Sequence, residues 1–451
     1  MDAGGTATDR RRAKTFVYAL CCTAAGMAPH WLPAGRSYWP AIALAVLLGG
    51  YSIRTVLLQS LRAADDSAAA AQARSLLIGP LAAVDVVVAA RDEQAVITRL
   101  VEHLAQLRYP EGLLRVWVVD DGSTDRTPDL LAGLQKLHPQ LQVVRRAADA
   151  GGGKSGALNL VLQQLQGRWM LVLDADAQLQ SDTLERLIPF AEAGGWAAVQ
   201  LRKAVANADV NLLTRAQAME MALDAVIQQG RLGVGGVAEL RGNGQLLRRD
   251  AVLACGGFNE ATVTDDLDLS FRLLVGGQPI GVLWDPPVRE EAVLGLRALL
   301  RQRQRWAEGG LQRFLDYGPA LLSSRLSPRQ RLDLICFFLL QYAMPMLGVA
   351  DMAGALVTRT LPCIWPLSIV ALGLSGLAIV SGCRRPSEGP ALPAMNPLAM
   401  GLGIVYLVHW FVVIPWVTLR MAVLPKRLVW AKTLHLGEDN DGCLAQAASE
   451  R

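Results

Sequence analysis

The chain is poor in the residues that usually build disulfide frameworks and zinc sites. Its 451 residues include only 7 cysteines, scattered from Cys21 to Cys443 without a C-x-x-C pair, and 5 histidines that are isolated from one another. The cysteine spacing fits a reduced or intramembrane location better than a disulfide framework. The isolated histidines argue against a zinc site.

Charge of one sign is also scarce, because the formal net charge is only +4. The basic residues lie beside apolar runs and are not interleaved with aromatic residues, which argues against nucleic acid as a partner. Hydrophobic residues, in contrast, make up 52% of the chain, more than soluble domains usually contain. We therefore expect membrane-spanning segments beside at least one soluble domain.

Long apolar runs lie towards both ends of the chain. The basic segment 10–14 precedes a run at 15–32, and a second run follows at 38–58. The first run looks like a signal peptide, but the second predicts a transmembrane hairpin over residues 1–62. Basic residues on both sides of this hairpin predict a multi-pass membrane protein whose middle part faces the cytoplasm.

Three further apolar runs follow the middle of the chain, at 332–357, 363–381 and 398–424. Three spans would place Lys426 and its basic neighbours outside, against the positive-inside tendency. The sequence leaves open whether one run is re-entrant, whether one forms a hairpin, or whether the topology is an exception.

The middle of the chain alternates between short β-branched runs and helical stretches. These runs are only five or six residues long and end in turn residues, which favours strands over buried helices. The alternation predicts βαβ units and a mostly parallel, buried sheet of the α/β class. We expect the strands at 84–89, 114–119, 141–145 and 169–173, with helices at 95–107, 127–137 and 155–165.

The expected domain organisation follows from these patterns. After the hairpin and a linker at 63–80, an α/β domain covers 81–290. Leucines at helical spacing with arginines between them predict interfacial amphipathic helices at 291–325. A C-terminal transmembrane region at 326–430 and a polar tail at 431–451 complete the chain.

Polar clusters follow the predicted strands, at the sheet edge where α/β folds bind ligands. The second strand ends in D-D-G-S-T-D, and a carboxylate there can accept hydrogen bonds from a ribose hydroxyl or a base N–H. We therefore assign Asp121 to nucleoside binding and Asp125 to a helix cap.

The loop G-G-G-K-S-G at 151–156 opens the next helix and is not a P-loop by its spacing. Its amides and Lys154 predict a phosphate site, although a flexible loop without function is the alternative.

Two acidic clusters complete the candidate chemistry. D-A-D places Asp174 and Asp176 on one side of an extended chain, where hard oxygen ligands imply Mg²⁺ or Mn²⁺ bound to a diphosphate. Two exposed acids that close a strand are the alternative.

T-D-D-L-D begins a helix with Thr264 as a candidate N-cap. Acidic residues are also favoured at a helix N-terminus without any catalytic role. The functional interpretation is that Asp266 takes a proton from an acceptor hydroxyl.

The motif Q-x-x-R-W lies on the predicted interfacial helix, where Gln302 and Arg305 share a face. Arg305 can stabilise a departing diphosphate, and Trp306 can form an apolar wall for a sugar or an acyl group. The other arginines of this helix are interpreted as basic residues that extend to a membrane surface: Arg297, Arg301 and Arg303.

Taken together, these motifs resemble membrane-anchored family 2 glycosyltransferases with the GT-A fold. The five motifs D-D-G-S-T-D, G-G-K-S-G-A-L-N, D-A-D, T-D-D-L-D and Q-x-x-R-W occur in the family's order within 84–309. The resemblance implies inversion by a single displacement, which gives a β-linkage. It also implies a set of roles: uridine binding by Glu93 and Asp121, phosphate binding by Lys154, sugar and metal binding by Asp174 and Asp176, base catalysis by Asp266, and the acceptor and diphosphate side lined by Gln302, Arg305 and Trp306.

Within that family, E-L-R-G-N-G-Q at 239–245 and the segment P-K-R at 425–427 resemble membrane monoglucosyldiacylglycerol synthases. Ala89 stands where many members have proline, and Asp265 stands where processive cellulose and hyaluronan synthases usually have glutamate. The resemblance implies transfer of a hexose, expected to be glucose, from a UDP-sugar to diacylglycerol in the bilayer. A processive β-glycan synthase and a non-catalytic nucleotide-sugar-binding scaffold are the alternatives. The sequence identifies neither the donor sugar nor the oligomeric state.

Overall fold

A central sheet organises the middle of the chain in the computed structural model, which describes residues 4–33, 35–56, 81–394 and 396–424. The sheet has seven strands in the order β3-β2-β1-β4-β6-β5-β7. All neighbouring strands are parallel except that β6 is antiparallel to both β4 and β5. This confirms the predicted mostly parallel α/β sheet. The strands are β1 (Val84–Ala90), β2 (Leu114–Asp120), β3 (Leu141–Arg145), β4 (Trp169–Leu173), β5 (Ala198–Val205), β6 (Gln245–Arg248) and β7 (Ile280–Glu290).

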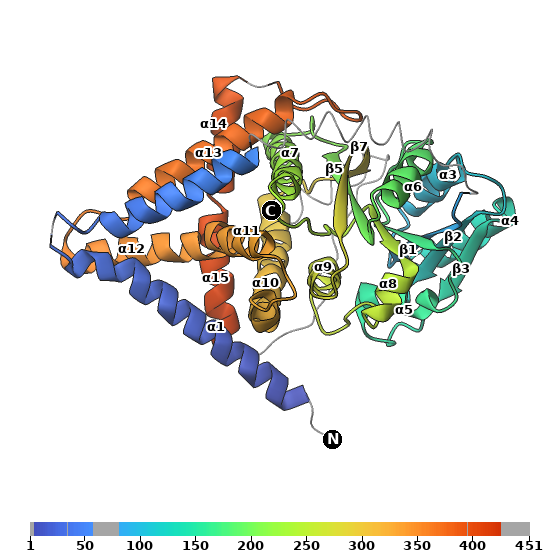
Figure 1. Ribbon diagram of the computed structural model, residues 1–451. Helices are drawn as coiled ribbons and strands as arrows, with labels where there is room; N and C mark the ends of the chain where they lie inside the picture. The colour runs from blue at the N-terminus through green and yellow to red at the C-terminus, as the bar shows by residue number, and fades with distance from the viewer. Residues whose placement is uncertain (1–3, 34, 57–80, 395, 425–451) are drawn as a thin grey trace.

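Helices cover both faces of the sheet (Figure 1). Every residue of β1 is buried, and its side chains alternate between two cores. Val86 and Val88 pack with one group of helices, whereas Val87 and Ala89 pack with the other. The first group is α3 (Ile97–Ala105), α4 (Thr127–Leu137) and α6 (Thr183–Ala193), and the second is α5 (Gly153–Leu162), α8 (Arg249–Ala254) and α9 (Asp265–Val275). This double cover explains why the strand reads as a continuous apolar run.

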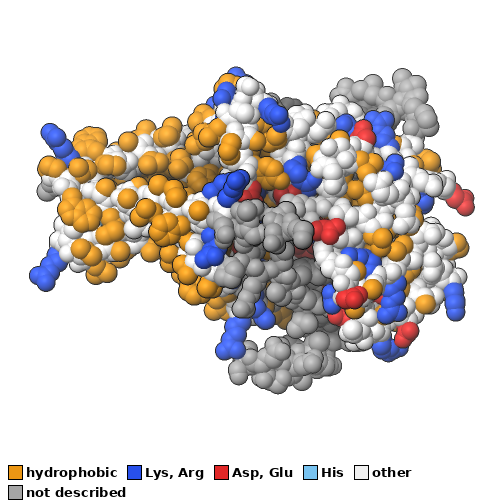
Figure 2. Space-filling model, turned by 90° about the horizontal axis from the view of Figure 1, so that it is seen from below, with side chains coloured by type: hydrophobic (Ala, Val, Ile, Leu, Met, Phe, Trp, Pro, Cys, Tyr) orange, Lys and Arg blue, Asp and Glu red, His pale blue; other side chains and the backbone are white. Residues whose placement is uncertain are grey.

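Four helices in the described part of the chain are long and apolar enough to cross a membrane: Trp39–Val56, Pro328–Thr358, Trp365–Arg384 and Pro397–Val423. Figure 2 shows that hydrophobic side chains dominate the surface of the membrane-spanning helices, while charged side chains gather over the sheet. The four helices coincide with the second N-terminal apolar run and with the three C-terminal runs. The three C-terminal helices comprise α11 (Pro328–Phe338), the π-helical turn η2 (Leu339–Ala343), α12 (Met344–Thr358), α13 (Trp365–Arg384), α14 (Pro397–Leu407) and α15 (Trp410–Val423).

The first apolar run forms α1 (Gly4–Met27), which packs against α12 and α15, and the short η1 (Ala28–Trp31), which packs against α12. Figure 1 shows α1 meeting the next helix at the tip of the bundle. Several predicted features lie outside the described residues: the linker at 63–80, the polar tail at 431–451, and the basic residues near Lys426.

Two long helices lie between the sheet and the membrane-spanning helices (Figure 1). The first, α7 (Leu212–Gly233), packs against β5 on one side and against α13 and α14 on the other. The second, α10 (Leu296–Leu321), carries Q-x-x-R-W and packs against α9 and α15. Both helices therefore connect the sheet to the apolar bundle.

Candidate active site

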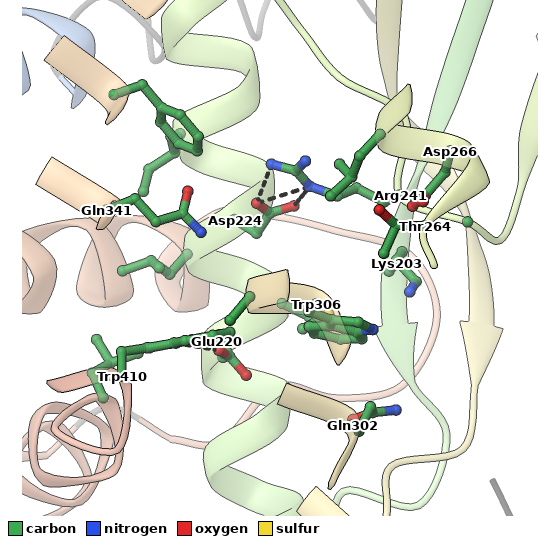
Figure 3. Close-up of a pocket in the computed structure, with 18 of the residues that line it drawn as sticks. Lys203, Glu220, Asp224, Arg241, Thr264, Asp266, Gln302, Trp306, Gln341 and Trp410 are labelled. Atoms are coloured by element: carbon green, nitrogen blue, oxygen red, sulfur yellow. Dashed lines mark hydrogen bonds and ion pairs between the residues drawn. The ribbon is translucent and has the colours of Figure 1, made fainter. Parts of the chain in front are cut away.

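A cavity of about 480 Å³ lies between the carboxyl edge of the sheet and the membrane-spanning helices. Its polar end is lined by all but one of the predicted site residues: Glu93, Lys154, Asp174, Asp176, Asp266, Gln302, Arg305 and Trp306. Its other end is lined by apolar residues of the membrane-spanning helices, including Leu340, Met344, Ala371, Leu374 and Phe411. Figure 3 shows residues from both ends of the cavity.

Asp121, the remaining predicted residue, is not among the residues that line this cavity. Its carboxylate accepts a hydrogen bond of 2.5 Å from Nη1 of Arg146, whose Nη2 donates to the carbonyl of Gly151 at 2.6 Å. Burial raises the pKa of Asp121 even though Arg146 acts in the opposite direction. Asp121 therefore fixes the glycine loop through Arg146, and its role in nucleoside binding stays a prediction.

The glycine loop carries Lys154 into the cavity. Gly151 and Gly152 have φ values of 70° and 69°, in the left-handed region that favours glycine. Lys154 follows in the first turn of α5, where its Nζ lies 2.5 Å from Asp174 and donates to the carbonyl of Gly242 at 3.0 Å. Burial disfavours the ammonium charge, but the neighbouring carboxylates outweigh it and raise the pKa of Lys154. Lys154 is therefore charged and fixed at the cavity wall.

The D-A-D segment departs from the predicted extended geometry. Strand β4 ends at Leu173, and the chain then turns, with the N–H of Ala177 donating to the carbonyl of Asp174. Asp174 and Asp176 both line the cavity all the same. The Oδ2 atom of Asp176 accepts the N–H of Glu291 at 2.9 Å, which ties this turn to the end of β7.

Helix α9 presents Asp266 to the cavity in its first turn. Burial, together with the adjacent charge of Asp265, raises the pKa of Asp266 to about 6. Thr264 occupies the N-cap position, but its side chain makes no capping hydrogen bond, which corrects the predicted cap. The Thr264 hydroxyl instead packs against Gly309 of α10, where an added Cβ would lie only 1.9 Å from it. Helices α9 and α10 thus approach closely beside the predicted base.

Helix α10 brings Gln302, Arg305 and Trp306 to the same cavity. The interpretation of Arg303 as a surface residue is wrong, because this residue is only 1% exposed. Its guanidinium pairs with Glu220 of α7 and lies 4.0 Å from the centroid of the Trp306 ring. Arg297 and Arg301 are exposed, as expected of a basic outer face.

Comparison with known proteins agrees with this geometry. Residues 81–309 match the family described as "Glycosyltransferase like family 2". This chain belongs to that family. It is 48% identical over 362 residues to a beta-monoglucosyldiacylglycerol synthase of Synechocystis sp., across 79% of this chain and 75% of the relative. A synthase of the same name from Nostoc sp. is 45% identical over 363 residues, across 80% of this chain and 78% of the relative.

The glycosyltransferase also resembles a solved mannosyltransferase from Pyrobaculum calidifontis, determined in complex with GDP-Man and Mn²⁺. The match has a TM-score of 0.50 at 20% identity and covers 81% of this chain and 99% of the mannosyltransferase. At this level of identity the likeness shows the shared fold.

The structure adds cavity residues of the glycosyltransferase that the sequence motifs do not indicate. Lys203, near the end of β5, lines the polar end, and its Nζ lies 2.8 Å from Glu290 and 5.7 Å from the centroid of the Trp306 ring. Although burial disfavours its charge, Glu290 raises the pKa of Lys203. Asp224 of α7, which no motif contains, also lines the cavity and forms an ion pair of 3.0 Å with Arg241 of the E-L-R-G-N-G-Q segment. Lys203 and Glu290 lie towards the ends of β5 and β7. The predicted strands include neither β5 nor β7, so the sequence does not place these two residues at the site.

A second titratable cluster lies at the tip of the bundle, away from the sheet. His30 lies 2.9 Å from Asp351, and the Sγ atom of Cys363 lies 3.8 Å from the His30 ring. The fold therefore brings together residues that look isolated in the sequence. The Asp351 carboxylate also accepts the N–H groups of Cys363 and Ile364, so its oxygens already serve as hydrogen-bond acceptors. This cluster joins η1 to the connection between α12 and α13.

Proposed function

We propose that the chain is an inverting glycosyltransferase that transfers glucose from UDP-glucose to 1,2-diacylglycerol and forms a β-monoglucosyl lipid. One observation carries this proposal: a single cavity joins the acidic end of the sheet to the apolar membrane-spanning helices. A lipid acceptor needs both surroundings, because its hydroxyl must reach the catalytic groups while its chains stay in apolar contact. The identity of 48% to a monoglucosyldiacylglycerol synthase supports the same acceptor.

In this proposal Asp266 is the general base. With a pKa of about 6, it is a carboxylate at neutral pH and can accept the proton of the acceptor hydroxyl. The hydroxyl oxygen then forms a bond to the anomeric carbon while the bond from that carbon to the diphosphate oxygen breaks. One such displacement inverts the anomeric centre, and UDP leaves.

The remaining residues bind and position the donor. The charged groups Lys154 of α5 and Arg305 of α10 both line the cavity and would hold the diphosphate. Trp306 provides an apolar wall for the sugar, and its ring is fixed by Arg303. The other proposed donor contacts are Glu93, Asp121, Asp174 and Gln302.

A divalent cation, Mg²⁺ or Mn²⁺, is part of this proposal. Asp174 and Asp176 place carboxylate oxygens at the cavity beside Lys154, and such hard donors suit either ion. Asp176 would hold the cation, with Asp174 directed to the sugar. When bound, the cation supplies positive charge that stabilises the leaving diphosphate.

The proposed location is the cytoplasmic side of a membrane, with the sheet in the cytoplasm. The basic segment 10–14 and the four long apolar helices support this orientation. Processive glycan synthesis is not favoured, since the synthases of Synechocystis sp. and Nostoc sp., which match 79% and 80% of this chain, are named for glucosylation of diacylglycerol.

The experiment uses membranes that contain the full chain, supplied with diacylglycerol and radiolabelled UDP-glucose or UDP-galactose. Lipids are extracted with chloroform, separated by thin-layer chromatography and treated with β-glucosidase. We expect label from UDP-glucose in a small glycolipid that β-glucosidase cleaves. Label in insoluble polymer would instead identify a glycan synthase. If the wild type and an Asp266→Asn variant transferred equal amounts of label, a transferase role for this site would be contradicted.

A further inference from the structure

The membrane-spanning helix Pro328–Thr358 carries polar side chains within an apolar span. Two of them are acids with basic partners: Asp333 lies 2.9 Å from Arg231, and Asp351 lies 2.9 Å from His30. Gln341, in contrast, makes no hydrogen bond to any described residue through either its amide nitrogen or its amide oxygen, and the oxygen is buried. A polar group inside a membrane helix is costly and usually serves a function. The described part of the chain therefore offers Gln341 no partner, and its presence in the span needs another explanation.

The backbone at Gln341 is also unusual. This residue lies in the π-helical turn η2, which joins α11 to α12. Pro345 has no N–H and so cannot donate to the carbonyl of Gln341 four residues earlier, as an α-helix requires. The helix widens at this point, and single π turns within α-helices often occur at functional sites. Leu340 and Gln341 of this turn line the cavity, as do Met344 and Pro345 at the start of α12.

The surroundings of Gln341 favour an amphipathic occupant. Figure 3 shows Gln341 and Trp410 on one side of the pocket and Asp266 and Lys203 on the other, with Asp224 between them. Asp224 is occupied by its ion pair with Arg241. The membrane-spanning helices line the cavity mostly with apolar side chains, including Leu340, Met344, Ala371, Leu374 and Phe411, together with a few hydroxyl groups such as that of Ser375. The occupant therefore needs one polar group opposite Gln341 and apolar chains around it.

We propose that Gln341 donates a hydrogen bond from its Nε2 to an ester carbonyl of the lipid acceptor and so selects acyl-linked glycerolipids. The inference rests on the function proposed above and concerns how the same cavity recognises its acceptor. In a diacylglycerol the ester groups lie between the reacting hydroxyl and the chains, and one cavity is lined by Asp266, by Gln341 and by apolar side chains of the membrane-spanning helices. An ether-linked dialkylglycerol has the same hydroxyl and chains but lacks the carbonyl oxygens.

The test compares purified full-length wild type with Gln341→Leu, each assayed on dioleoylglycerol and on its dioleyl ether analogue in mixed micelles. We expect the wild type to prefer the diester, and Gln341→Leu to raise KM for the diester about tenfold with little change for the diether. That change corresponds to the loss of one buried hydrogen bond, since about 1.4 kcal/mol equals a factor of ten. The KM for UDP-glucose should stay unchanged, because Gln341 contacts only the acceptor.

The matched control is Gln106→Leu, the same substitution at an exposed position at the end of α3. It should keep the preference for the diester. A variant Gln341→Asn, which retains the amide but shortens its reach, should lose the preference as Gln341→Leu does. Equal losses on the two acceptors, or equal use of both by the wild type, would overturn the role of Gln341 while leaving lipid glucosylation intact. If the wild type glucosylates neither lipid, the proposed function itself is wrong.

Discussion

The guanidinium of Arg303 lies 4.0 Å from the centroid of the Trp306 ring and pairs with Glu220 on α7. Glu220 also accepts hydrogen bonds from Tyr406 at 2.8 Å and Trp410 at 3.0 Å, on the membrane-spanning helices. One buried carboxylate thus connects the Q-x-x-R-W helix, α7 and the apolar bundle. The orientation of Trp306 at the cavity wall depends on this connection.

Removing the charge of Glu220 should destabilise the protein. In Glu220→Gln the buried guanidinium of Arg303 loses its counter-charge, which costs about 3–5 kcal/mol when one partner of a buried pair is removed. Thermal unfolding in detergent, followed by tryptophan fluorescence, measures the loss. The double variant Glu220→Gln with Arg303→Met should recover part of it, and equal stability of the single and double variants would contradict the pairing argument.

Loss of the base should abolish turnover without loss of donor binding. Asp266→Asn keeps the side-chain shape but cannot accept the hydroxyl proton, so kcat should fall by about 10²–10⁴-fold. Calorimetric titration with UDP should give a dissociation constant close to that of the wild type. Undiminished turnover would remove Asp266 from the mechanism.

Turnover should also depend on pH through the same carboxylate. Burial and the charge of Asp265 raise the pKa of Asp266 to about 6, and the base acts only when deprotonated. The rate should therefore be half-maximal near pH 6 and fall about tenfold per unit below it. A pH profile of kcat/KM, recorded with a saturating divalent cation, measures this limb. The range from about pH 5 to about pH 7 extends one unit to either side of this pKa. A rate that stays constant over that range would contradict the assignment.

Lys203 should contribute to donor binding. Its ammonium pairs with Glu290 at the polar end of the cavity, which Lys154 also lines. The ammonium of Lys203 can therefore contact the diphosphate in addition to that of Lys154. Lys203→Met should raise KM for the UDP-sugar about tenfold, as expected for loss of a charge-assisted hydrogen bond of about 1.4 kcal/mol. Lys203→Arg should recover much of this affinity. An unchanged donor KM in Lys203→Met would exclude contact with the donor.

The close approach of α9 and α10 makes Gly309 sensitive to substitution. A Cβ at this position would lie 1.9 Å from the Thr264 hydroxyl, so Gly309→Ala should destabilise the protein by about 1–3 kcal/mol. Gly318 of the same helix has no heavy atom within 4 Å of an added Cβ. Gly318→Ala should therefore stabilise α10 by up to about 1 kcal/mol. Unfolding temperatures that change equally in the two variants would contradict the packing argument.

The sequence predicts the first half of the sheet well, because β1 to β4 are short apolar runs that end in turn residues. Their motifs follow directly at the carboxyl ends, so the cavity residues Lys154, Asp174 and Asp176 could be found by position along the chain. Strands β5 to β7 lack this signal. Strand β6 has only four residues, and β7 contains Pro286 and Pro287, which do not mark a strand.

The sequence could not predict contacts between distant segments. Arg303 looks like one of several basic residues on an amphipathic helix, and its partner Glu220 is 83 positions away. Lys203 and Glu290 meet only because β5 pairs with β7. The local sequence predicts a capping role for Thr264, but the packing of α10 against α9 overrides it.

The position of Glu220 has a practical consequence for work with this enzyme. Its hydrogen-bonding partners Tyr406 and Trp410 belong to α14 and α15, so the buried carboxylate is completed by residues from the lipid-embedded half. Excising residues 81–309 as a water-soluble fragment would strip those partners away and open the acceptor end of the cavity to solvent. Biochemical reconstitution should therefore keep the chain whole, in nanodiscs or detergent.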